Sequence, residues 1–123
     1  MKYFTYKIGH YGYKARTRNI VYLESYKRKV TLHLANGLEY EFYGKLRDIY
    51  KESLLGCGFI HIHRSYLVNF KYIAKFKRLE LTLTDGTTLP VSKLRYDEIK
   101  AQYLNYLDAN SSSEDNYASG VVV

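Results

Sequence analysis

The chain has 123 residues, 46% of them hydrophobic, which suits one domain with an apolar core and is too short for two domains of ordinary size. Its 19 lysines and arginines against 12 aspartates and glutamates give a net charge of +7, which favours a polyanionic partner such as nucleic acid. No apolar run approaches the roughly 18 residues of a membrane span, the N-terminal residues lack a signal-peptide pattern, and a lone cysteine, Cys57, excludes an intrachain disulfide.

Alternating apolar and polar residues predict β-strands over much of the first half of the chain. Residues 3–8 alternate, and residues 28–34 do so more strictly. The Asn36–Gly37 dipeptide then predicts a hairpin turn, with residues 38–42 as the returning strand. These patterns indicate antiparallel strands with one buried face.

The middle of the chain departs from this alternation. Residues 44–56 have apolar side chains near helical spacing, and Gly56 can end a helix in the left-handed conformation. Residues 59–63 again predict a strand. Residues 64–70 fit either a turn or a short helical turn.

A second hairpin is predicted further along the chain. Residues 78–84 alternate strictly, and Asp85–Gly86 supplies the turn to a returning strand over residues 87–92. Pro90 cannot donate a hydrogen bond to a neighbouring strand, so it predicts a sheet edge or a strand end.

The C-terminal part predicts one helix and a tail. Residues 93–107 have a rough apolar stripe, with Ser92 as the predicted N-cap. Residues 108–123 are polar and aperiodic, and we expect a disordered tail; they carry −3, so the preceding residues carry +10. We therefore expect one domain over residues 1–107. Neither helical segment is basic along one face, so no helix-turn-helix is predicted.

The stretch FIHIHRSYLVN, residues 59–69, holds the side chains best suited to chemistry. His61 and His63 would project from one face of a strand and could bind zinc, but no third ligand stands at a zinc-site spacing. Ser65 beside His63 lacks a nucleophile elbow, and the sequence has no glycine-rich phosphate loop. We therefore expect no metal, no cofactor and no enzymatic activity.

Three basic clusters fit nucleic acid better. Arg64 follows a strand where the chain turns, and its guanidinium suits a guanine or a phosphate. Residues 26–29 lie where a strand begins, and residues 92–95 lie at a helix start, where free N–H groups favour phosphate. For His63 two interpretations stay open: a brace for the following loop, or a direct DNA contact.

The segment FIHIHRSYLVNFKYIAKF, followed by LTLTDGTTLPVSK, resembles the LytTR family of DNA-binding domains. The residues that match the family pattern are Phe59, His63, Arg64, Ser65, Val68, Asn69, Ile73, Gly86, Pro90, Val91 and Ser92. The resemblance covers residues 3–107. It implies a mainly β fold of elongated antiparallel sheets with short helices, whose loops reach successive major grooves of DNA and the minor groove between them.

The resemblance also implies a function. Such a domain is the output half of a bacterial response regulator in a two-component system, cytoplasmic, and binds double-stranded promoter DNA at paired repeats, usually as two copies. It has no small-molecule substrate. From the basic clusters and the resemblance together, the expected DNA-binding residues are Lys27, Arg28, Lys29, His63, Arg64, Ser65, Ser92, Lys93 and Arg95.

Two departures leave alternatives open. Lys93 stands where the family often has arginine, and a lysine cannot make the same bidentate contact. The family's usual receiver domain has no room in these residues, so an excised output domain and a short protein regulated otherwise both fit. The alternative function is a protein-interaction or membrane-associated sensor module without DNA binding.

Overall fold

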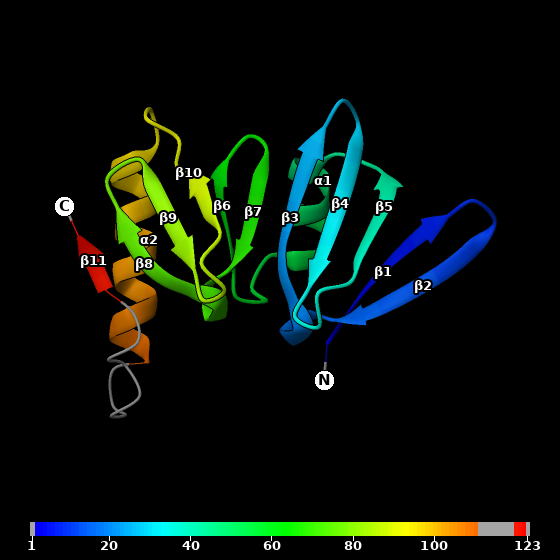
Figure 1. The fold of residues 1–123 in the computed structure, drawn as a ribbon, viewed down its shortest axis with the longest axis horizontal. Helices are drawn as coiled ribbons and strands as arrows, with labels where there is room; N and C mark the ends of the chain where they lie inside the picture. Colours follow the sequence, from blue (N-terminus) through cyan, green and yellow to red (C-terminus); the bar gives the residue numbers. More distant parts are fainter. Residues whose placement is uncertain (1, 111–119, 123) are drawn as a thin grey trace. The chain divides into compact units, whose positions relative to one another are not determined.

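The computed structural model describes residues 2–110 and 120–122, and the chain divides into two compact units, Met1–Lys71 and Tyr72–Val123. Strands dominate the first unit, the second unit combines strands with one helix, and nearly all strands pair antiparallel, so the predicted mainly β class with short helices is confirmed (Figure 1). The span expected as one domain comprises the first unit and most of the second.

The first unit contains two sheets. β1 (Tyr3–Ile8) and β2 (Tyr11–Arg16) form a two-stranded sheet, and a short 3₁₀ turn, Thr17–Asn19, leads to a five-stranded sheet in the order β5-β4-β3-β7-β6. The strands of the larger sheet are β3 (Ile20–Tyr26), β4 (Lys29–Leu34), β5 (Glu39–Tyr43), β6 (Phe59–His63) and β7 (Tyr66–Asn69). Because β7 pairs with β3, two hairpins that are distant in sequence share one sheet.

The predicted helix over residues 44–56 is shorter in the structure. It consists of α1 (Leu46–Ile49) and a π-helical turn, Tyr50–Leu54. Leu55 has an extended backbone, which ends the helix before Gly56, although Gly56 does adopt the positive φ expected of it.

The core of the first unit follows from the alternation in its strands. Val30 and Leu32 on β4 are fully buried, and they lie opposite Phe42 on β5 and Leu23 on β3. Burying one such side chain stabilises the fold by about 1.5–3 kcal/mol. Leu54 brings the π-helical turn into the same cluster.

The second unit is a four-stranded sheet with one helix. A 3₁₀ turn at Phe70–Tyr72 spans the boundary between the units. The sheet order of the second unit is β10-β9-β8-β11, and its elements are β8 (Ile73–Lys77), β9 (Glu80–Leu83), β10 (Thr88–Pro90), α2 (Tyr96–Ala109) and β11 (Gly120–Val122). Pro90 lies on the edge strand, as predicted. Tyr103 of α2 is fully buried and stacks on Phe76 of β8, with ring centroids 5.5 Å apart.

Both predicted hairpins are present, and both use three-residue turns in which only glycine is left-handed. Gly37 and Gly86 have φ of 89° and 92°. In each turn an Asn or Asp side chain accepts a backbone hydrogen bond two residues on, Asn36 from Leu38 and Asp85 from Thr87. Glycine at the last turn position is what this hairpin type requires.

Two expectations for the C-terminal part differ from the structure. Ser92 was the predicted N-cap, and this is wrong: α2 starts at Tyr96, Arg95 occupies the cap position, and no side chain caps the helix there. The expected disordered tail falls mainly on residues 111–119 and 123, which lie outside the described residues. At its described ends, α2 continues to Ala109 and β11 pairs parallel with β8.

Candidate nucleic-acid interface

The turn between β3 and β4 displays two basic side chains in a strained backbone. Tyr26 pairs with Lys29, which leaves Lys27 and Arg28 as a two-residue turn. Their φ angles are 47° and 68°. Asparagine and glycine usually occupy such turns, and other residues cost about 1–2 kcal/mol each in this conformation. Strain of this kind persists where function needs it, and both side chains are exposed.

The turn between β6 and β7 displays Arg64 and is braced by His63. The backbone N–H of Ser65 donates to Nδ1 of His63 over 3.0 Å. Burial lowers the pKa of His63, and the positive charge of Arg64 lowers this pKa further, which favours the neutral ring that can accept this bond. Arg64 itself is exposed. The hydrogen bond supports the brace interpretation of His63.

These two turns lie side by side at one end of the five-stranded sheet. Glu24 on β3 pairs with Tyr66 on β7, and the N–H of Ser25 donates to the carbonyl oxygen of Ser65 over 2.9 Å. Figure 1 shows the β3–β4 turn and the β6–β7 turn at the same end of this sheet. The structure therefore brings together six of the nine expected residues: Lys27, Arg28, Lys29, His63, Arg64 and Ser65.

Two tyrosines that the sequence analysis did not single out flank this basic end. Tyr26 and Tyr43 are 72% and 79% exposed, and each lies directly opposite Lys29, one on β3 and one on β5. The amine of Lys27 lies 5.4 Å from the centroid of the Tyr26 ring. Exposed rings beside cations can stack on sugars or bases, or donate hydroxyl hydrogen bonds to phosphate.

The sequence did contain a signal for Tyr43. Along β5 it follows Glu39 and Glu41 at a spacing of two, so it shares the solvent-facing phase of the strand. Tyrosine is also common on strands, so this phase marks Tyr43 only as solvent-facing, and its place opposite Lys29 is what makes it a candidate contact.

Two carboxylates near this end contact neighbouring side chains. Glu24 Oε1 lies 2.6 Å from Nε2 of His33, and Glu41 lies 4.0 Å from the amine of Lys29. The exposed pair of Lys29 and Glu41 adds little stability. Both carboxylates thus have a partner on the neighbouring strand β4.

The third expected cluster lies in the second unit, between β10 and α2. The hydroxyl of Ser92 accepts a hydrogen bond from the N–H of Arg95 at 3.3 Å, and Lys93 is exposed. The guanidinium of Arg95 contacts Glu98 at 3.3 Å. Asp97 and Glu98 occupy the first turn of α2, which makes this helix start less attractive to phosphate than the sequence analysis assumed.

The described residues give little support to the other interpretations of this stretch. A β-bulge interrupts β6 between His61 and His63. Within residues 2–110 and 120–122, no group of three or more histidine, cysteine, aspartate or glutamate side chains is placed to hold a metal ion. Nor does this part of the chain contain a helix long and apolar enough to cross a membrane.

Comparison with known proteins relates the chain to DNA-binding domains. The family model of the LytTr DNA-binding domain matches residues 12–104. The fold is similar to the LytTr DNA-binding domain of a putative methyl-accepting/DNA response regulator from Bacillus cereus, with a TM-score of 0.67 and 23% identity over 85% of this chain and 97% of the other. No curated protein matches the chain.

Proposed function

Because the chain belongs to the LytTR family of DNA-binding domains, we propose that it is a sequence-specific transcription regulator whose two basic turns read promoter DNA. The observation that carries the proposal is the hydrogen bond from Ser25 to Ser65, which joins these turns into one basic surface. A surface on which separate loops share a rigid sheet can hold a fixed register on DNA.

The two turns differ in the contacts they can make. Arg64 leaves a turn that is braced by His63 and followed by the buried Leu67 and Val68, so its guanidinium starts from a fixed backbone. A fixed guanidinium suits the two acceptors of a guanine in the major groove. Lys27, Arg28 and Lys29 supply charge to the phosphates, which position a protein without reading sequence.

The second unit adds a further contact in this proposal. Lys93 is exposed and follows β10, so it is suited to a phosphate. Arg95 shares its guanidinium with Glu98, and Ser92 engages the backbone of Arg95, so both chiefly support the loop that presents Lys93.

The wider setting is part of the same proposal. We place the protein in the cytoplasm as the output of a two-component response regulator, with two copies on paired promoter repeats and no catalytic step. When two copies bind neighbouring repeats together, each would raise the effective concentration of the other at its repeat.

The experiment begins with selection of bound sites from random double-stranded DNA, followed by titration of the selected site at several salt concentrations. Neutralising roughly 4–8 phosphates predicts a slope of log affinity against log salt of about −4 to −7. Two selected repeats at a fixed spacing, with two protein copies bound, would support the paired arrangement. A flat salt dependence, or no enriched sequence, would contradict DNA reading and favour an interaction module.

A further inference from the structure

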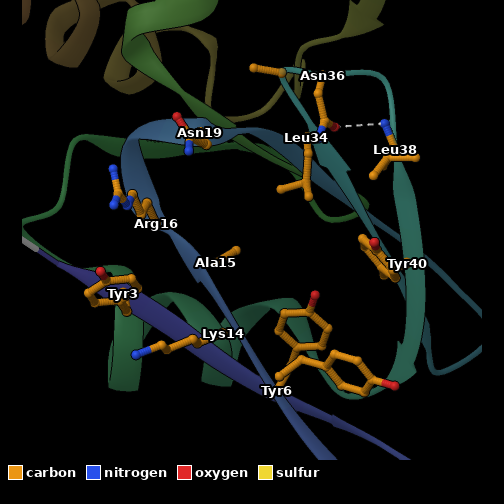
Figure 2. A pocket seen from close by; sticks show the side chains of 12 residues that line it. Tyr3, Tyr6, Lys14, Ala15, Arg16, Asn19, Leu34, Asn36, Leu38 and Tyr40 are labelled. Carbon is orange, nitrogen blue, oxygen red and sulfur yellow. Dashed lines mark hydrogen bonds between the residues drawn. The ribbon is translucent and has the colours of Figure 1, made fainter.

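Several exposed apolar side chains of the first unit lie in a group. Leu34, Leu38 and Tyr40 line one cavity of about 640 Å³, which Figure 2 shows from close by. Tyr40 stacks there with Tyr13, with ring centroids 6.4 Å apart. Side chains gathered around one hollow shield one another partly from water, and Leu38 is accordingly 52% exposed.

Leu94 of the second unit has no such shelter. It is 98% exposed, the highest value among the large hydrophobic side chains that the structure describes. A side chain this exposed adds almost nothing to the core, because hydrophobic stabilisation is proportional to the apolar area removed from water. Single exposed leucines are common on protein surfaces, so the meaning of Leu94 depends on the loop that carries it.

This loop, between β10 and α2, is held at both ends. At its start Val91 is buried, and its N–H donates to the carbonyl oxygen of Leu79 over 3.1 Å. At its end the N–H of Arg95 donates to the hydroxyl of Ser92 over 3.3 Å, which closes a turn. Leu94 lies within that turn, so its exposed side chain leaves a tethered backbone.

The charges around Leu94 favour a base contact over a purely ionic one. Lys93 is exposed beside it, whereas the guanidinium of Arg95 contacts Glu98 at 3.3 Å. Asp97 and Glu98 in the first turn of α2 offset much of the positive charge of the loop. This loop therefore offers phosphate less than the two basic turns of the first unit do, and what it presents in addition is an aliphatic tip.

The edges of base pairs in the major groove carry one alkyl group, the 5-methyl group of thymine. From this match, and resting on the proposed function, we propose that Leu94 contacts the methyl group of a thymine and selects thymine at one position of the DNA site. Lys93 pairs with a nearby phosphate and keeps the loop at the groove.

The test uses the full chain and the DNA site selected from random sequences. Each thymine on either strand is replaced in turn by deoxyuridine, which lacks only the 5-methyl group and pairs with adenine unchanged. Affinity is measured by titration of labelled duplexes at one fixed salt concentration. We expect one thymine position at which uracil weakens the parent about threefold to fivefold, the factor that corresponds to one buried carbon.

Two variants assign this effect to a side chain. Leu94→Ala should weaken binding to the thymine site by a similar factor and lose the sensitivity to uracil at that position, with an unchanged melting temperature because the side chain is not buried. Leu94→Met, which keeps a long apolar side chain, should retain the sensitivity. Leu38→Ala is the matched control, an exposed leucine in the cavity of the first unit, and should keep the full uracil effect.

An enriched site with no thymine at which uracil weakens binding would overturn this inference alone. So would a Leu94→Ala variant that keeps the full uracil effect. Equal weakening of the thymine and uracil sites by Leu94→Ala would also overturn it, and would make Leu94 a wedge between base pairs instead. A parent chain that enriches no DNA sequence would overturn the proposed function, and this inference with it.

Discussion

The backbone N–H of Ser25 donates a hydrogen bond to the carbonyl oxygen of Ser65, and this 2.9 Å contact ties the turn of one hairpin to the turn of another. The two residues come from β3 and from the turn before β7, which pair within the same sheet. The turns on either side of this contact are therefore joined within one sheet, and changes in one can be tested for their effect on the other.

We predict that Arg64 reads a base. Arg64→Ala should cost about 1–3 kcal/mol on the selected DNA site and relax the preference at one base position, because the bidentate contact is lost. Arg64→Lys should recover little, since an ammonium cannot grip two acceptors at once. Parallel titrations on selected and scrambled DNA are the measurement. Equal weakening on both DNAs, with an unchanged melting temperature, would instead make Arg64 a phosphate contact.

For the strained turn, we expect one variant to raise stability and to weaken DNA binding. Lys27→Asn combined with Arg28→Gly should stabilise the fold by about 1–2 kcal/mol, because these residues accept left-handed backbone readily. The same variant should bind all DNA sequences more weakly, with the salt slope flattened by about two units. Urea unfolding and salt titration measure the two effects. Lys51→Ala serves as the control for loss of a lysine elsewhere, and its slope should match that of the parent. A less stable turn variant would contradict the strain, and unaltered DNA affinity would remove the turn from the interface.

The brace at His63 predicts a dependence on pH. Since the pKa of His63 is lowered in the folded chain, the unfolded chain takes up the proton first as pH falls below the ordinary histidine pKa of about 6.5. Stability should fall through that range and level off below the folded-state pKa. Protonation also removes the acceptor for Ser65, so base preference should weaken.

Other histidines titrate in the same range, so the measurement is a comparison with His63→Gln. The free energy of unfolding should drop more in the parent than in the variant between about pH 7.5 and about pH 5. If the free energy of unfolding changes with pH in the same way for the parent and the variant, His63 does not cause the pH dependence.

Asn69 is expected to matter for stability rather than for DNA. It is 5% exposed, its amide donates to the carbonyl oxygens of Thr17 and Ile20, and its side-chain oxygen accepts from Lys71. Asn69→Ala should lower the free energy of unfolding by about 2–3 kcal/mol, because buried backbone groups lose their partners. Asn105→Ala, on an exposed position of α2, should stay within about 0.5 kcal/mol. Chemical denaturation separates the two, and a small effect at Asn69 would mean that water replaces its hydrogen bonds.

The C-terminal residues are expected to oppose DNA binding. Truncation after Asn110 removes Glu114 and Asp115, so binding to unrelated DNA should strengthen modestly as repulsion from phosphate is relieved. The truncation also removes the three-residue pairing of β11 with β8. Titration on scrambled DNA and thermal unfolding are the measurements. A melting temperature lowered by several degrees would show that this pairing stabilises the second unit substantially.

Local patterns in the sequence were enough for much of the fold. Gly37 and Gly86 mark the hairpins because a left-handed turn position favours glycine wherever it occurs. The position of Arg64 after a predicted strand indicated the turn there, but the expectation of a turn or a short helical turn over residues 64–70 is wrong for Tyr66–Asn69, which form the strand β7. What could not be predicted is that this turn lies beside Lys27 and Arg28, because the pairing of β3 with β7 joins segments far apart in sequence.

Conformations that oppose local preference were also beyond prediction. Lysine and arginine have no preference for the left-handed conformation, so the identities of Lys27 and Arg28 do not predict it. The strands on either side impose this turn. The shorter helix after β5 has a similar cause: Leu54 is buried with the core, and the next residue turns extended to lead into β6.

The pairing of β3 with β7 also predicts the order in which the proposed DNA-binding surface forms. The meander β3–β4–β5 and the hairpin β6–β7 pair neighbouring segments and can form early, whereas Tyr22 meets Val68 only after a long loop closes. We expect the two basic turns to stay apart during most of folding and to meet in its last step. In native-state hydrogen exchange, the amides between β3 and β7 should then open before those between β3 and β4. DNA bound across both turns should slow that opening most of all.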